Sequence, residues 1–258
     1  MRFNCTCPAT HTGQRCEKKI TYPKSCKDIA ESGNLASGNY IVYDSLGVTF
    51  SVYCGFEESN TGFAWTLIQS FSFSKKNLFY SDKEFSTDCP INNNLNQVDW
   101  TEYRLSLSQM QSIADHSTHF RATCNYLTDG LDYTDYARAK LEGYSIFETW
   151  DEVCKSYEYL NIRGLECHDC TALTKQKPGK AWFINSDISK LSGCDFDGSQ
   201  GSVSNENNFG RYRSGTVNPA HRCSASPAST TQYWFGAIIN LWRTQSNFIF
   251  LRHGWCIL

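Results

Sequence analysis

The chain has 258 residues, 19% of them charged, and a formal net charge of −2 at pH 7. This near-neutral balance lacks the basic surface that nucleic acid requires and the attraction that holds a protein on an anionic membrane. No stretch approaches the roughly 20 consecutive apolar residues of a membrane-spanning helix, so the sequence predicts no membrane span.

The first 18 residues contain three cysteines, Cys5, Cys7 and Cys16, and few aliphatic side chains. A segment of this kind cannot build a hydrophobic core and must be held together by covalent bridges. Asn4 begins the sequence Asn-Cys-Thr, which makes it a candidate for N-glycosylation. Residues 19–24 are a polar linker, and alternating apolar and polar stretches begin after it.

A β-hairpin is predicted shortly after the linker. Residues 38–43 and 48–54 alternate apolar and polar side chains, and residues 44–47 have the composition of a turn. Residues 64–69 form the next predicted strand.

The clearest helix is predicted from residue 107 to about residue 116. Ser106 and Gln109 form a capping-box pair at its start. His116 and His119 follow at its end, and we expect both to be exposed helix-end histidines, because a zinc site would need a further ligand that the sequence does not supply.

Four further strands are predicted, over residues 120–126, 181–185, 233–241 and 248–251. Gly, Ser and Asn-rich loops separate them, above all residues 186–231. The elements together predict an α+β fold with an antiparallel or mixed sheet, few short helices and disulfide-tied loops.

The whole chain contains 13 cysteines, which is more than a cytosolic protein normally keeps. We therefore expect extracellular disulfides. Cys167 and Cys170 have the spacing of a zinc or redox pair, but their flanks, residues 163–165 and 171–173, favour a loop. A structural disulfide is expected there instead.

A calcium loop is the one metal site that the sequence suggests, and no other cofactor is expected. Asp195 and Asp197 precede a glycine turn, and Glu206 lies beyond it, so several carboxylate oxygens could meet one Ca²⁺. The alternative is an Asp-Gly turn closed by Cys194.

Residues 129–136 alternate carboxylates and tyrosines. Such a segment could contact a sugar, a protein, a mineral or a cationic partner, or it could be a solvated loop or edge strand. For catalysis, the sequence contains no G-x-S-x-G motif, and composition alone cannot assemble a nucleophile, a base and an orienting group. We therefore predict a protein that is not an enzyme.

The spacing C-x-C-x8-C from Cys5 to Cys16, with Gly13 before the last cysteine, resembles the C-terminal part of an EGF-like module. The resemblance implies a Cys7–Cys16 disulfide. In that family the first of the three cysteines pairs further upstream, so Cys5 would be unpaired in this chain.

Residues 25–29, 37–40, 50–54 and 65–69 resemble the opening of fibrinogen C-terminal-like domains, and the resemblance is strong over residues 25–70. It implies a Cys26–Cys54 disulfide that joins the first strand region to the hairpin.

After Gln69, the family's Phe-Trp-Leu-Gly strand, calcium loop and pocket segment are missing, so its ligand and calcium sites are not carried over. The later half looks like divergent fibrinogen-related proteins of cnidarians, some of which resemble proteins of the coral skeletal organic matrix.

The predicted domains are an EGF-like remnant at 1–18, a linker at 19–24 and a fibrinogen C-terminal-like domain at 25–258. If the two implied disulfides form, an even number of cysteines remains to pair among themselves, and Cys5 is the exception. This set is Cys89, Cys124, Cys154, Cys167, Cys170, Cys194, Cys223 and Cys256. We therefore expect the chain to be a fragment of a longer protein.

The sequence thus predicts a secreted, non-catalytic protein of adhesion or extracellular matrix, with matrix proteins, glycans or a mineral surface as partners. A mineralised skeletal organic matrix is one possible setting. A soluble fibrinogen-related lectin that binds surface glycans is the alternative.

Overall fold

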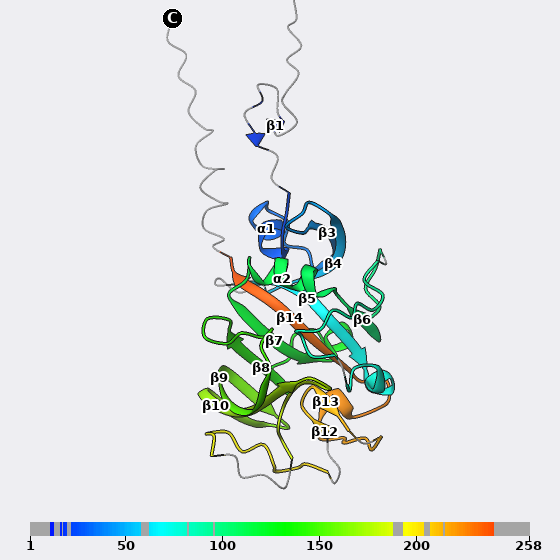
Figure 1. Ribbon diagram of the computed structural model, residues 1–258, viewed down its shortest axis with the longest axis vertical. Coiled ribbons are helices and arrows are strands. Elements are labelled where there is room, and N and C mark those ends of the chain that lie inside the picture. Colours follow the sequence, from blue (N-terminus) through cyan, green and yellow to red (C-terminus); the bar gives the residue numbers. More distant parts are fainter. Residues whose placement is uncertain are drawn as a thin grey trace, which may run out of the picture.

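The fold is dominated by one antiparallel sheet of ten strands, seen in the computed structural model of Figure 1. The structure describes residues 11–12, 16, 18–19, 22–57, 62–81, 83–94, 96–187, 193–203, 207–213 and 215–239. The strand order is β11-β10-β9-β8-β7-β14-β5-β4-β3, and β6 pairs with β5 from outside this path. Its strands are β3 (Gly38–Tyr43), β4 (Thr49–Phe56), β5 (Phe63–Ser72), β6 (Glu102–Arg104), β7 (His119–Cys124), β8 (Tyr136–Lys140), β9 (Trp150–Ile162), β10 (Leu165–Lys177), β11 (Lys180–Ile184) and β14 (Thr230–Ile238).

The remaining elements are short. They are the strand pairs β1 (His11–Thr12) with β2 (Lys18–Lys19) and β12 (Asn207–Asn208) with β13 (Arg211–Tyr212), the helices α1 (Cys26–Glu31), α2 (Leu107–Ala114) and α3 (Tyr126–Asp129), and the 3₁₀ turns η1 (Phe73–Leu78) and η2 (Arg222–Ser224). The protein is therefore rich in sheet, with few short helices and several disulfides, as a disulfide-rich α+β fold requires. Among the described residues, no helix is both long and apolar enough to cross a membrane.

The last described strand, β14, lies in the middle of the sheet between β5 and β7 (Figure 1). All ten residues of β5 are buried, so both faces of this central region are covered. A Cβ atom at Gly236 of β14 would lie 2.3 Å from the Trp65 ring of β5, which shows that glycine makes room for the indole there. In this sheet β14 is the strand that joins β5 to β7.

A buried guanidinium lies at the same junction. The Arg121 side chain of β7 is fully buried, and its NH1 group donates to Glu57 Oε1 at 2.8 Å. The Arg121 guanidinium also lies over the rings of Trp65 and Trp234, at 4.3 and 4.7 Å from their centroids. Cation–π contacts and one carboxylate thus replace the water that this charge has lost.

Most of the predicted elements are confirmed with small changes of boundary. The capping box of Ser106 and Gln109 starts α2 as expected, and β3 has the predicted bounds of 38–43. The predicted strand at 248–251 lies outside the described residues.

Three sequence-based expectations are wrong. Cys26 begins helix α1 rather than a strand, and residues 163–173 are largely strand β10 rather than loop. His119 lies in β7, 6% exposed, and not at an exposed helix end. The errors have different causes. The disulfide and a hydrogen bond to Thr66 tie α1 to distant residues, and Glu158 of β9 contacts the buried His119. The β9–β10 hairpin is formed instead by two neighbouring strands that pair with each other.

Four disulfides join described residues: Cys26–Cys54, Cys124–Cys223, Cys154–Cys194 and Cys167–Cys170, with sequence separations of 28, 99, 40 and 3. The first is the pair that the fibrinogen-like resemblance implies, although it attaches α1 to β4. Cys16 is also disulfide-bonded. Cys89 is half-buried, with its Sγ atom 3.7 Å from the Thr87 carbonyl oxygen. Cys5, Cys7 and Cys256 lie outside the described residues.

The Cys124–Cys223 disulfide should contribute most to stability, because its separation of 99 residues closes the longest of these loops. In the chain-entropy account, a loop of about 100 residues is worth about 4.7 kcal/mol and one of about four residues about 2 kcal/mol. We therefore expect Cys124→Ala/Cys223→Ala to lower the free energy of unfolding by more than Cys167→Ala/Cys170→Ala, measured by urea denaturation. Equal losses in the two double variants would contradict the entropic account.

Candidate functional site

The predicted calcium loop uses its carboxylates within the fold. Asp195 Oδ2 accepts hydrogen bonds from the Thr171 amide at 2.9 Å and from the Thr171 hydroxyl at 2.7 Å. Asp197 Oδ1 accepts from the Ser199 amide at 3.0 Å. These bonds lower the pKa of both carboxyls. Glu206 lies outside the described residues, and the described part of the chain holds no cluster of three metal-ligating His, Cys, Asp or Glu side chains.

The acidic and tyrosine-rich segment at 129–136 turns out to be paired internally. The Arg222 guanidinium lies 2.5 Å from an Asp129 carboxylate oxygen and 3.3 Å from one of Asp132. The hydrogen bond from Arg222 is the main cause that lowers the pKa of Asp129. Much of the negative charge that the sequence suggested for an external partner is therefore neutralised within the chain.

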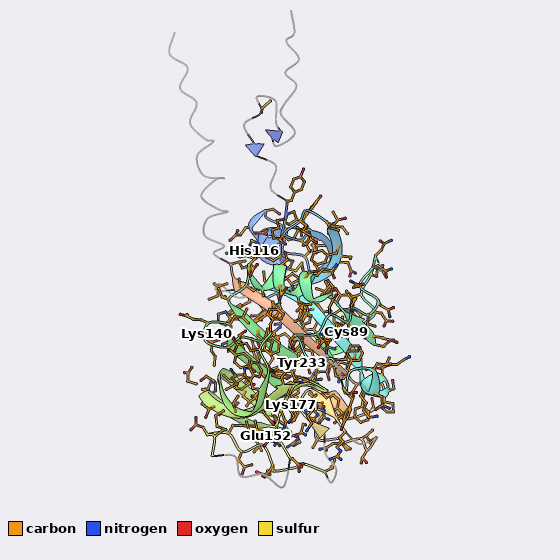
Figure 2. All side chains as sticks on the ribbon, in the orientation of Figure 1. Cys89, His116, Lys140, Glu152, Lys177 and Tyr233 are labelled. Carbon is orange, nitrogen blue, oxygen red and sulfur yellow. A yellow bond between two sulfur atoms is a disulfide. The ribbon has the colours of Figure 1, made fainter. Side chains whose placement is uncertain are left out.

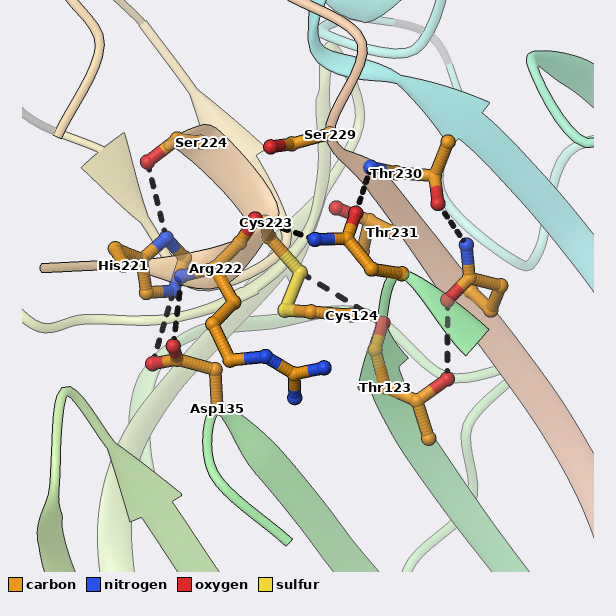
Figure 3. The surroundings of a disulfide bond; sticks show 12 residues. Thr123, Cys124, Asp135, His221, Arg222, Cys223, Ser224, Ser229, Thr230 and Thr231 are labelled. Atoms are coloured by element: carbon orange, nitrogen blue, oxygen red, sulfur yellow. Dashed lines mark hydrogen bonds and ion pairs between the residues drawn. A yellow bond between two sulfur atoms is a disulfide. The ribbon is translucent and has the colours of Figure 1, made fainter. Parts of the chain in front are cut away.

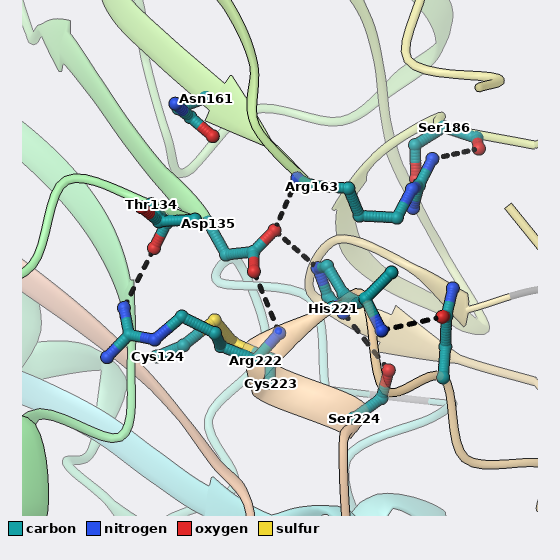
Figure 4. Close-up of polar contacts among 12 residues, drawn as sticks. Cys124, Thr134, Asp135, Asn161, Arg163, Ser186, His221, Arg222, Cys223 and Ser224 are labelled. Atoms are coloured by element: carbon teal, nitrogen blue, oxygen red, sulfur yellow. Dashed lines mark hydrogen bonds and ion pairs between the residues drawn. A yellow bond between two sulfur atoms is a disulfide. The ribbon is translucent and has the colours of Figure 1, made fainter. Parts of the chain in front are cut away.

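Asp135, in the same segment, is fully buried and forms the centre of a polar cluster (Figure 4). Its two carboxylate oxygens accept the backbone amides of Arg163 and Arg222, each at 2.7 Å. Arg163 lies in the turn between β9 and β10, whereas Arg222 begins η2. One carboxylate thus holds together three segments that are far apart in the sequence.

His221 completes this cluster. Its Nε2 atom is 3.6 Å from Asp135 Oδ1, and its Nδ1 atom is 3.1 Å from Ser224 Oγ. Burial lowers the pKa of His221 to about 4, despite the opposing effect of Asp135. The imidazole is therefore neutral at pH 7.

The three residue types are those of a hydrolytic triad, but this arrangement does not allow nucleophilic catalysis. His221, Ser224 and Asp135 are all 0% exposed, so no substrate can reach the hydroxyl. Ser224 also contacts Nδ1 and Asp135 contacts Nε2, the reverse of the serine hydrolase arrangement. The cluster has a structural role.

The Cys124–Cys223 disulfide lies beside the cluster (Figure 3). Asn125, next to Cys124, accepts the Thr230 amide through Oδ1 at 2.7 Å and donates to the Arg222 carbonyl at 3.2 Å. The disulfide and these hydrogen bonds position the segment that leads into β14.

A surface hollow of about 470 Å³ is a candidate binding site on the flank of the sheet. It lies where β8 and β9 separate, since they pair only over Tyr136–Arg138 and Tyr159–Asn161. Its lining contains cationic, anionic, hydroxyl and aromatic groups: Lys140, Glu142, Gly143, Tyr144, Cys154, Lys155, Ser156, Tyr157, Glu158 and Asp169. Figure 2 shows Lys140 at this flank.

A second, more apolar hollow of about 400 Å³ shares Lys140 and Glu142 with the first. Its walls include Leu141, Ala237 and Ile238, together with Lys27 from α1 and His119 from β7. The two hollows are therefore neighbours, one with a more polar and one with a more apolar lining.

Glu158 lines the polar hollow and lies among three basic side chains. It lies 3.2 Å from His119 Nε2, 3.0 Å from Arg138 Nε and 3.5 Å from Lys140 Nζ. Burial alone would raise the pKa of Glu158, but these three neighbours outweigh burial and lower it. For His119 the direction is set by burial, which lowers the pKa of the imidazole. The neighbouring Glu158 carboxylate acts in the opposite direction.

The remaining predicted site residues, Asn4, Cys5, Cys7, Cys256 and Glu206, lie outside the described part. The sequence reasoning missed Glu158, His221 and Arg222, because each gains its role from partners many residues away. The 20-residue separation of Arg138 and Glu158 leaves no local motif.

The sequence matches no family model. A search of curated proteins also finds no match.

Stability should fall as the pH is lowered from about 6.5 to about 4, because only the unfolded state protonates His221 in that interval. The shift corresponds to roughly 3 kcal/mol of unfolding free energy. We expect His221→Asn to flatten this dependence, measured by urea denaturation between pH 7.5 and pH 4.5.

His116 provides the matched control, since it is exposed near the end of α2 (Figure 2). His116→Asn should leave the pH dependence of stability unchanged. A pH dependence that is the same in His221→Asn and in the unsubstituted chain would show that the buried imidazole is not its source.

Proposed function

We propose that this chain is a non-catalytic extracellular protein of adhesion or matrix assembly, with an EGF-like remnant before a divergent fibrinogen C-terminal-like domain. The observation that carries this proposal is the disulfide frame. Three of its bridges close loops with separations of 28, 40 and 99 residues, and such bridges persist in oxidising compartments.

Two features support the proposal. The Cys26–Cys54 bridge and the β3–β4 hairpin lie within the part of the sequence that resembles the fibrinogen-like family. The contact between a histidine and a serine that most resembles a catalytic pair, His221 with Ser224, is fully buried. Matrix proteins, glycans or a mineral surface are the partners that we propose, with a skeletal organic matrix as the setting.

The polar hollow favours a second candidate, a soluble lectin. Lys140, Lys155 and Ser156 can donate hydrogen bonds there, whereas Glu142 and Asp169 can accept them. Sites for small polar ligands are built around a small number of such groups, and β8, β9 and β10 each contribute one or more of them here.

A binding experiment with the secreted chain tests both candidates. We expect the adhesion protein to bind extracellular matrix preparations in either Ca²⁺ or EDTA, or to bind calcium carbonate in buffer without EDTA. On a glycan array it should show no selectivity, with Ca²⁺ or with EDTA. Selective glycan binding that EDTA abolishes would contradict the matrix proposal and support the lectin. If the polar hollow holds that glycan, Asp169→Asn should weaken binding by about tenfold or more. The substitution removes the negative charge and replaces one acceptor oxygen of the carboxylate with an NH₂ donor.

A further inference from the structure

The polar hollow beside β9 is lined by charged side chains that the fold itself does not neutralise. Two of its lining residues, Glu158 and Lys140, already form an ion pair with each other. In the described part of the chain, by contrast, no ion pair or side-chain hydrogen bond engages Lys155, Glu142 or Asp169. One ammonium group and two carboxylates therefore line the hollow without a partner in the chain.

The Lys155 ammonium is held in position by aromatic rings. Its Nζ atom lies 4.1 Å from the centroid of the Trp150 ring and 5.2 Å from that of Tyr144. Burial lowers the pKa of Lys155, and Glu148 is the only carboxylate of the described residues that opposes this effect. The two unpaired carboxylates of the same hollow are therefore too far away to act as counter-ions of Lys155. The rings hold the ammonium by cation–π attraction and leave its N–H groups available to an anion.

The Asp169 carboxylate lies at an irregular position of β10. Asp169 has a φ of 46°, in the left-handed region that such a residue adopts within a strand only where its surroundings impose it. The Cys167–Cys170 disulfide encloses it, and β10 pairs with β9 on both sides of it. These two constraints restrict where the carboxylate can point before a ligand is bound.

We propose that the polar hollow binds a small zwitterion, with Lys155 as the partner of the ligand carboxylate and Asp169 and Glu142 as the partners of its ammonium groups. The separation of opposite charges across the hollow favours this class of ligand, because a ligand of one sign would leave the opposite charge of the hollow unmatched. A volume of about 470 Å³ lies within the range of roughly 300–1,000 Å³ that is usual for small-molecule sites.

The numbers of unpaired groups narrow the class further. A basic amino acid such as lysine carries one carboxylate and two ammonium groups, which match the one ammonium and two carboxylates of the hollow. A simple carboxylic acid would match Lys155 alone. This assignment goes beyond the matrix proposal, because it concerns the small molecule that the hollow accepts and not the surface to which the chain attaches.

Isothermal titration calorimetry of the folded full chain with L-lysine tests this assignment. We expect saturable binding of one molecule per chain. L-Lysine amide lacks the carboxylate, and Nα,Nε-diacetyl-L-lysine lacks both ammonium groups, so each should bind about tenfold or more weakly than L-lysine.

Substitutions in the hollow assign the charges to their partners. Lys155→Gln should weaken L-lysine binding by about tenfold or more, but it should change the binding of L-lysine amide little, because the amide has no carboxylate for Lys155 to bind. Asp169→Asn should show the same contrast between L-lysine and the diacetyl compound.

Lys76→Gln is the matched control. Lys76 also lies over an aromatic ring, with its Nζ atom 4.8 Å from the centroid of Phe73, and it does not line the polar hollow. This variant should bind L-lysine as the unsubstituted chain does. Near-ultraviolet circular dichroism checks that each variant is folded.

Three results would overturn the proposal. They are the absence of saturable L-lysine binding, equal affinities for L-lysine and its amide, and a folded Lys155→Gln variant that binds L-lysine as tightly as the Lys76→Gln control. Matrix attachment and glycan selectivity are measured in separate experiments, so neither outcome there depends on lysine binding.

Discussion

The Asp135 carboxylate is fully buried, where an ionised group is stable only if hydrogen-bond donors replace the water that it has lost. Two backbone amides do so, one from the β9–β10 turn and one from η2. Their segments lie 28 and 87 residues from Asp135 along the chain. The long β9–β10 hairpin, the loop before β14 and the start of β8 consequently adopt their positions together.

Arg121 presents the opposite problem, a buried cation, and the fold solves it differently. Only one of its nitrogens has a carboxylate partner, while Trp65 and Trp234 cover the guanidinium. Since these rings belong to β5 and β14, the charge helps to align the three central strands. The two buried charges therefore stabilise different joints of one sheet, Arg121 at its centre and Asp135 near the β8–β9 junction.

These internal demands also determine what the surface offers. Arg222 neutralises Asp129 and Asp132, and Glu158 is shared among His119, Arg138 and Lys140. Glu142 and Asp169 are further carboxylates, and both line the hollow where β8 and β9 part. That hollow presents side chains of both signs, because Lys140 and Lys155 line it as well.

Much of the fold could be predicted from local patterns. The period-2 alternation located the β3–β4 hairpin, and Ser106 with Gln109 located the start of α2, because these signals depend on neighbours a few residues apart. The β9–β10 hairpin escaped prediction. The four exposed residues from Asp151 to Cys154 near the start of β9 do not alternate, and the two strands are held by each other and by the Asp135 contact to their turn.

The candidate site could be predicted even less well, because the residues that form it are distant in sequence. By itself, the sequence determined the disulfide-rich α+β class, the hairpin and the capped helix, since composition and short-range periodicity carry that information. Only the tertiary structure decided that β14 inserts between β5 and β7, that Asp135 meets His221, and that β8 and β9 separate around a hollow. These features depend on long-range strand order and on the desolvation of charges, which no local pattern encodes.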